Sequence, residues 1–213
     1  MIKISESVKQ LLIINVLFFI GSMALNGVLM GIDTELFKTY GRFSLAIFYF
    51  ESPFFEPFQI VTHMFMHADL GHLFFNMFGL YMFGSLLERR LGARDFLILY
   101  FVSGVAALLL QMLAYGYEIH FQDAMRLMQT PMLGASGALM GVYAATAFFF
   151  PNMQVFLLFP PIPLKMKYLV IAFIAIDLFS GFGGGTGIAH FAHVGGALGG
   201  FLLSLYWKKN RYV

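Results

Sequence analysis

The chain of 213 residues is 60% hydrophobic and only 11% charged, with a mean hydropathy of +0.80. Soluble domains carry about 25% charged residues, so this composition excludes that class and indicates one compact helical membrane domain. The net charge of +2 gives no support to a nucleic-acid partner. The absence of cysteine excludes disulfides, thiolate metal sites and a cysteine nucleophile.

Apolar stretches predict six membrane-spanning helices, each of which ideally needs about 20 residues. The first stretch also has features of a signal peptide, because basic residues precede it and a small-residue run lies at 22–24. It is, however, longer than the usual apolar core of about 7–15 residues. In chain order the predicted spans are residues 11–30, 70–87, 96–115, 136–150, 164–182 and 188–207.

The segments between these spans differ in character. Residues 31–57 mix aromatic and charged side chains, so we expect a half-embedded loop in the membrane interface between the first two spans. Residues 115–133 are expected to re-enter the membrane beside a polar cavity. The prolines between 151 and 163 indicate a rigid link, and the glycine-rich run at 183–187 indicates a tight loop.

Basic residues predict how the chain is oriented. With six spans both termini lie on one side, and ten of the 13 Lys and Arg residues fall on that side. The positive-inside rule then places both termini in the cytoplasm, as in a multi-pass protein of a bacterial inner membrane. We therefore expect a cytoplasmic segment at residues 1–10, one six-helix domain at 11–207 and a cytoplasmic basic tail at 208–213.

A serine flanked by glycines opens the fourth predicted span. Residues 132–141 read M-L-G-A-S-G-A-L-M-G, with Ser136 at the start of the apolar run. Gly137 and Gly141 are four residues apart, which is typical of close helix packing in membranes. A serine on a glycine turn at a helix N-terminus is also typical of a nucleophile, because the helix dipole favours developing negative charge. This stretch alone leaves both interpretations open.

Four polar residues are predicted to share one depth in the membrane, where polar groups mark function by default. His72, Asn76, Ser136 and His193 all lie near the outer start of their spans. His193 is a candidate base for Ser136, since a neutral imidazole can accept the hydroxyl proton. The alternative for His193 is a hydrogen bond to a neighbouring helix.

Small residues favour a close approach of the fourth and sixth spans. His193, Gly196 and Gly200 share one helical face, as Gly137 and Gly141 do on the fourth span. Two glycine faces allow helix backbones to touch. Such a contact would bring the imidazole near the serine.

His72 and Asn76 are four residues apart and point from one face of the second span. Both donate hydrogen bonds, as an oxyanion hole requires, and the Ser136 backbone N–H is a third candidate donor. The alternative is that both residues only bridge or pack against neighbouring helices.

The other histidines suggest a metal site only weakly. His63 and His67 are four residues apart and His190 and His193 three apart, but the glutamate of the zinc-protease motif H-E-x-x-H is missing. We therefore expect no metal and no cofactor. Asp177, near the end of the fifth span and sixteen residues before His193, suits a structural or cavity role better than that of a third triad member.

Taken together, these motifs resemble the rhomboid family of intramembrane serine proteases. The resemblance covers residues 11–207. G-A-S-G alone is unspecific, whereas its combination with the other motifs in the right spans is specific. The matching pieces are G-A-S-G at 134–137, A-H-V-G-G at 192–196 with Gly200 beyond, H-x-x-x-N from His72 to Asn76, and E-R-R-L-G at 88–92.

The resemblance implies an all-α, six-transmembrane-helix bundle that acts without a metal. It gives Ser136 the nucleophile role and His193 the base role in a dyad without a third catalytic acid. It assigns the oxyanion role to His72, Asn76 and the Ser136 N–H. It also implies that the fifth span moves aside to admit substrate.

One departure from the family pattern concerns residue 140. Many family members carry an aromatic residue there, which packs on the catalytic histidine, and this chain has Met140. A thioether can still contact an imidazole. His193 is then expected to be held less firmly, and the role of His190 stays open.

Two functions remain as hypotheses. The first is a serine endopeptidase that cleaves transmembrane segments of membrane proteins near the outer face of the bilayer. The alternative is a non-proteolytic binding or transport protein that uses the same polar cavity. It is weakened by the absence of a charged translocation path and of a paired half.

Overall fold

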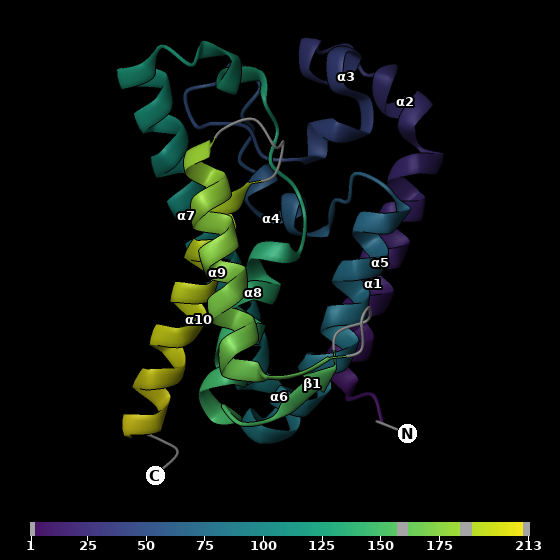
Figure 1. The fold of residues 1–213 in the computed structure, drawn as a ribbon. Helices are drawn as coiled ribbons and strands as arrows, with labels where there is room; N and C mark the ends of the chain where they lie inside the picture. Colours follow the sequence, from purple (N-terminus) through teal and green to yellow (C-terminus); the bar gives the residue numbers. More distant parts are fainter. Residues whose placement is uncertain (1–2, 157–161, 184–188, 211–213) are drawn as a thin grey trace.

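The computed structural model describes residues 3–156, 162–183 and 189–210, and their long helices run side by side as one bundle (Figure 1). Helix α8 lies between α1 and α5 on one side and α7, α9 and α10 on the other (Figure 1). The start of α1 and the end of α10 lie at the same end of the bundle. The bounds are α1 (Glu6–Ala24), α5 (Leu70–Gly79), α7 (Ala93–Gln122), α8 (Ser136–Phe149), α9 (Met166–Gly183) and α10 (His190–Asn210).

The helices have the apolar surfaces of a membrane protein. Among the described residues, α1, the continuous helix Leu70–Leu91 and α7 are long and apolar enough to cross a bilayer, and α8 is a shorter apolar helix. Large apolar side chains point outward, with Leu113 70% and Phe179 81% exposed. Such surfaces are favourable against lipid. The chain is therefore an all-helical membrane protein, and α8, α9 and α10 beside the three long helices are consistent with the predicted six.

The first helix begins and ends earlier than the predicted residues 11–30. It ends at Ala24, and a separate short helix α2 (Asn26–Met30) follows. The start of α1 is held by Glu88. Its carboxylate accepts hydrogen bonds from the N–H groups of Ser7 (3.1 Å) and Val8 (3.0 Å). These N–H groups have no partner within the helix, and negative charge at a helix N-terminus is stabilising.

The expected interface loop, residues 31–57, has a folded core of its own. Gln59 is fully buried and connects distant parts of this segment. Its amide nitrogen donates to the carbonyls of Ser44 (2.9 Å) and Phe54 (3.0 Å), and its oxygen accepts from the Glu56 N–H (3.1 Å). Short helices complete the segment: α3 (Glu35–Tyr40), η1 (Gly41–Leu45), α4 (Gln59–Thr62) and η2 (His63–Phe65).

The second span begins where the sequence predicts, because Asp69 caps it. The Asp69 carboxylate accepts from the His72 N–H at 2.9 Å, so α5 starts at Leu70. The helix continues through the π-helical turn η3 (Leu80–Gly84) into α6 (Ser85–Leu91). It ends at Gly92, whose φ of 82° is readily adopted only by glycine.

Helix α7 has 30 residues and extends beyond the predicted 96–115 at both ends. After it, the chain makes the turn η4 (Met125–Gln129) and returns to the bundle. On the way Met132 and Ile47 exchange backbone hydrogen bonds of 2.7 and 2.9 Å. The segment predicted to re-enter therefore consists of helix and an extended stretch that pairs with the interface loop.

The proline-rich link contains two paired strands that the sequence analysis missed. Strand β1 (Gln154–Phe156) runs antiparallel to β2 (Pro163–Lys165). Apart from residue 183, the glycine loop predicted at 183–187 lies outside the described residues. The first residue of the predicted sixth span and residues 211–213 of the predicted tail also lie outside them.

Helices α8 and α10 touch backbone to backbone. A Cβ added at Gly196 would collide with the carbonyl group of Gly137, and one added at Gly200 would lie 2.5 Å from the Gly141 Cα. Only glycine permits this approach. The glycine faces of the two spans therefore meet, and they set the distance between the helices that carry Ser136 and His193.

This contact predicts that Gly200→Ala lowers the free energy of unfolding by about 1–3 kcal/mol, because the new methyl group must push the helices apart. Unfolding by denaturant in detergent micelles measures the change. Gly21→Ala in α1 is the matched control, because a Cβ there meets nothing within 4 Å. Equal effects of the two substitutions would contradict the prediction.

Candidate active site

Ser136 is the first residue of α8, where the chain arrives from an extended segment. Gly134 has a φ of 121° and its N–H donates to the His63 carbonyl at 2.9 Å. A side chain at Gly134 would be strained by that φ and would lie 2.8 Å from the His72 ring. The glycine turn thus presents Ser136 at a helix N-terminus, where the helix dipole favours an anion.

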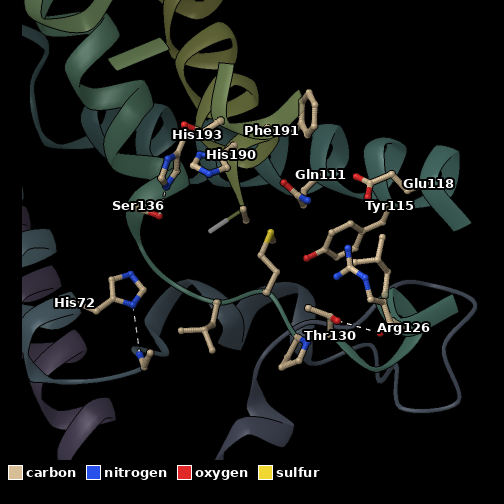
Figure 2. A pocket seen from close by; sticks show the side chains of 18 of the residues that line it. His72, Gln111, Tyr115, Glu118, Arg126, Thr130, Ser136, His190, Phe191 and His193 are labelled. Carbon is tan, nitrogen blue, oxygen red and sulfur yellow. Dashed lines mark hydrogen bonds between the residues drawn. The ribbon is translucent and has the colours of Figure 1, made fainter. Parts of the chain in front are cut away.

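His193 lies in the first turn of α10 and faces Ser136 (Figure 2). Its Nε2 is 2.8 Å from the Ser136 Oγ, which is hydrogen-bonding distance. The side chain of His193 is 19% exposed. The two residues are 57 positions apart in the chain and meet because α8 and α10 are in contact at their glycines.

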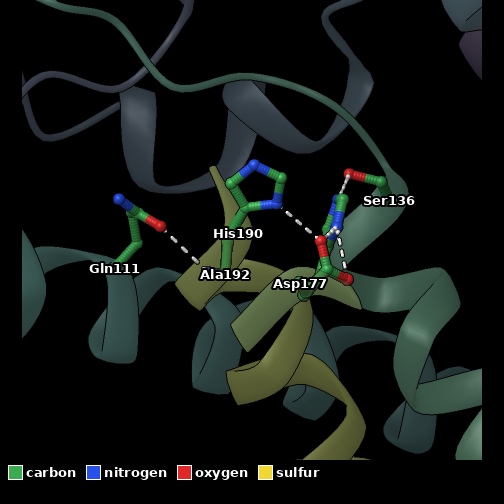
Figure 3. A network of polar contacts seen from close by, with 6 residues as sticks. Gln111, Ser136, Asp177, His190 and Ala192 are labelled. Atoms are coloured by element: carbon green, nitrogen blue, oxygen red, sulfur yellow. Dashed lines mark hydrogen bonds and ion pairs between the residues drawn. The ribbon is translucent and has the colours of Figure 1, made fainter. Parts of the chain in front are cut away.

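The other nitrogen of His193 is bonded to Asp177 of α9, a contact that the resemblance did not lead us to expect. His193 Nδ1 lies 3.0 Å from Oδ1 and 3.1 Å from Oδ2 of Asp177. His190 Nδ1 lies 2.7 Å from the same Oδ1 (Figure 3). The one sequence signal for this contact was a carboxylate within a predicted span, where polar groups are costly.

His72 lies next to the serine on the side opposite His193 (Figure 2). Its Nδ1 accepts a long hydrogen bond of 3.4 Å from the Ala68 N–H. In a neutral ring the proton then sits on Nε2. That nitrogen faces the Gly134–Ser136 turn, because a Cβ placed on Gly134 would lie 2.8 Å from it. His72 therefore presents a hydrogen-bond donor beside Ser136.

Asn76 lies one helical turn beyond His72 on α5 and is 6% exposed. Within the described residues its side-chain nitrogen has no hydrogen-bond partner. A buried amide without a partner is costly, so it calls for an acceptor that arrives with a ligand. Asn76 is not among the residues that line the cavity described next.

A cavity of about 550 Å³ lies beside Ser136 (Figure 2). His72, Ser136 and His193 lie on its wall. The cavity is roomy and polar enough to hold water. Charged side chains on the same wall are Asp69, Glu118 and Arg126.

Two further histidines lie beside this site: the His63 carbonyl accepts the Gly134 N–H, and His67 packs against His72. His63 Nδ1 bonds the Gln59 carbonyl at 2.8 Å, and the ring of His67 packs edge-on against His72 with centroids 5.1 Å apart. Burial lowers the pKa of both His63 and His67 to about 4, so both rings are neutral near pH 7. No three His, Asp or Glu side chains in the described part of the chain are grouped as metal ligands.

Met140, where the family pattern favours an aromatic residue, is 5% exposed and belongs to the main hydrophobic core. The structure places His193 between Ser136 and Asp177 instead. The arrangement is a hydroxyl with an adjacent imidazole, the His72 donor beside it and a polar cavity. Its chemistry is that of acyl transfer through a serine nucleophile.

Comparison with known proteins agrees with this chemistry. The Rhomboid domain matches residues 54–210. The chain is 34% identical to Rhomboid protease AarA of Providencia stuartii over 155 residues, which is 67% of this chain and 53% of that protein. It is 32% identical to the mitochondrial Rhomboid protein 1 of Saccharomyces cerevisiae over 155 residues, 71% of this chain and 42% of that one.

A bacterial relative of more similar length also matches. The putative rhomboid protease YdcA of Bacillus subtilis is 29% identical over 162 residues, which is 74% of this chain and 72% of that protein. The matches to the AarA and yeast proteins, by contrast, span about half or less of those proteins.

The geometry predicts that a fluorophosphonate probe labels the wild-type protein at Ser136, because His193 removes the hydroxyl proton as the serine attacks. Labelling of the protein in detergent is read by mass spectrometry. His193→Ala is expected to slow labelling by about 10²–10⁴-fold, the usual contribution of a general base. Labelling at an unchanged rate in His193→Ala would contradict the assignment.

Proposed function

Because this chain belongs to the rhomboid family, we propose that it is an intramembrane serine endopeptidase that cleaves transmembrane segments of membrane proteins. The observation that carries the proposal is the 2.8 Å contact between Ser136 Oγ and His193 Nε2 on the wall of a polar cavity. A serine and histidine that only packed helices together would need neither a cavity nor free donors beside them.

In the first half of the reaction Ser136 Oγ attacks the peptide carbonyl carbon while His193 Nε2 takes the hydroxyl proton. The carbonyl oxygen becomes an oxyanion. The Nε2–H of His72, the amide of Asn76 and the Ser136 N–H are the donors that stabilise it. Collapse of this intermediate breaks the C–N bond, and the leaving amine receives the proton from His193.

Water from the cavity completes the reaction. His193 takes a proton from a water molecule that attacks the acyl-Ser136 ester, and the second tetrahedral intermediate uses the same donors. Its collapse returns the proton to Ser136 and releases the carboxylate product. The charged groups Asp69, Glu118 and Arg126 on the wall keep the cavity hydrated.

The location of the cleavage follows from the proposed topology. With both termini in the cytoplasm, α5, α8 and α10 begin at the outer side, and Ser136 and His193 lie in the first turns of their helices. Cleavage then takes place near the outer face of a bacterial inner membrane. Substrates are single-span proteins whose helices are weakened near that face, because an extended peptide is needed to reach Ser136.

The proposal is tested in liposomes that contain the protein and a single-span substrate with helix-breaking residues near one end. We expect cleavage near that end by the wild type and none by Ser136→Ala. Ser204→Ala is the matched control, because Ser204 is a buried serine of α10 that bonds the Gly200 carbonyl away from the cavity. An intact substrate with folded wild type would favour the binding or transport alternative.

The oxyanion assignment predicts that Asn76→Ala lowers kcat by about 10²–10³-fold with KM changed little, because the donor acts mainly in the transition state. His72→Ala is expected to act in the same direction. Phe75→Ala serves as the control, since that neighbouring side chain is 62% exposed on the outside of α5. A loss that appears only in KM would contradict the assignment.

A further inference from the structure

A buried carboxylate faces the dyad from a helix that carries neither of its members. Asp177 lies in α9 and is 8% exposed. An ionised carboxylate at membrane depth is costly unless it is paired and hydrogen-bonded. Both oxygens of Asp177 have partners, and both partners are histidines of the first turn of α10. The carboxylate is therefore tied to the base of the dyad.

The contact determines which nitrogen of His193 holds the proton. A carboxylate only accepts hydrogen bonds, so the Nδ1 between Oδ1 and Oδ2 of Asp177 carries hydrogen. In the neutral ring Nε2 then has the lone pair, and it is Nε2 that faces the Ser136 hydroxyl at 2.8 Å. This is the tautomer that a general base needs.

The carboxylate also stabilises the positive charge that forms on His193 during the reaction. When His193 takes the serine proton it becomes an imidazolium, and Asp177 lies in direct contact with it. Attraction between these charges is stronger in a poorly polarisable interior than in water. The ion pair is made in the transition state and is absent in the resting enzyme, so it accelerates the reaction.

His190 holds Asp177 from the other side. Its Nδ1 donates to Oδ1 at 2.7 Å, and its ring is buried. His190 and His193 are three residues apart and face the same side of α10. The carboxylate thus lies between two rings and has little freedom to turn away from His193.

Building on the proposed peptidase function, we propose that Asp177 is the positioning residue of His193 and that His190 in turn positions Asp177. The four residues Ser136, His193, Asp177 and His190 form one hydrogen-bonded chain. In this protein the chain of hydrogen bonds orients the imidazole that an aromatic residue at position 140 would otherwise support.

The test compares two replacements of Asp177, by asparagine and by alanine. A structural role and a positioning role predict opposite orders for the loss of kcat in these two variants. Asp177→Asn keeps the size and still bonds both rings, but its NH₂ group can donate to His193 Nδ1 and turn the ring to the unreactive tautomer. Asp177→Ala removes all contacts and leaves the ring free to adopt either tautomer. If Asp177 only ties the helices together, alanine lowers kcat more than asparagine does. If Asp177 positions His193, asparagine lowers kcat at least as much as alanine does.

We expect Asp177→Asn to lower kcat by about 10²–10⁴-fold while KM stays within about threefold, in line with the usual contribution of acid–base catalysis. Asp177→Ala is expected to retain at least as much kcat, and Asp177→Glu to recover about tenfold over Asp177→Asn, since its carboxylate restores the acceptor. Ile176→Ala is the control for a general disturbance of α9, because that side chain is 61% exposed.

His190 is tested through the same carboxylate. His190→Gln is expected to lower kcat by less than Asp177→Asn does, because Asp177 still contacts His193. The double variant is expected to lose no more than Asp177→Asn alone, since coupled residues are not additive. Losses that multiply would overturn the role of His190.

The outcomes separate this inference from the function on which it rests. If the wild type cleaves and Ser136→Ala does not, the peptidase stands. An Asp177→Asn variant that then keeps at least one third of the wild-type kcat overturns the positioning role. The positioning role is also overturned if Asp177→Ala lowers kcat more than Asp177→Asn does and both losses of kcat are accompanied by lower midpoints of thermal unfolding. A wild type without activity would instead refute the peptidase itself.

Discussion

The backbone contact between α8 and α10 determines whether a reaction centre exists at all. Gly196 and Gly200 of α10 lie against the backbone of Gly137 and Gly141 of α8, and a side chain at either α10 position would separate the two helices. Ser136 and His193 lie in the first turns of the same two helices, next to the contact. Because a proton passes only across a short hydrogen bond, the proposed reactivity of Ser136 depends on residues that have no side chain.

Across the bundle, buried polar groups are satisfied by hydrogen bonds within the protein. Asp177 lies between two histidines, Glu88 caps α1, and Gln59 connects the interface segment through four hydrogen bonds. Each of these groups would be costly if left without partners in a medium that offers none. Asn76 differs, because its buried amide nitrogen has no partner within the described residues. Asn15, His67, Tyr100 and Ser103 each have a buried polar atom in the same situation. The proposed oxyanion would supply an acceptor for the Asn76 amide.

The sequence was sufficient to predict features that depend on local signals. The apolar run that begins at residue 70 and the glycine turn before Ser136 marked helix starts, and glycine spacing indicated which faces of α8 and α10 meet. Features that depend on tertiary packing were missed. The partners of Gln59 lie up to fifteen residues before it in the chain, and the orientation of Asp177 depends on how α9 packs against α10. Residue spacing alone does not determine such an orientation, and spacing alone predicts only a structural or cavity role for Asp177.

Asp177 reaches the site from α9, which also carries exposed apolar side chains such as Ile176 and Phe179. The same helix is thus both a lipid-facing wall of the bundle and the source of the carboxylate. A displacement of α9 toward the lipid would separate Asp177 from His193 and leave the imidazole unaligned. If Asp177 positions His193 as proposed, a protein in which α9 has moved outward would not have a reactive Ser136. Lipid or water that entered the open protein would meet a Ser136 without an aligned base. Ser136 would become reactive only after α9 had returned to its place with a substrate bound.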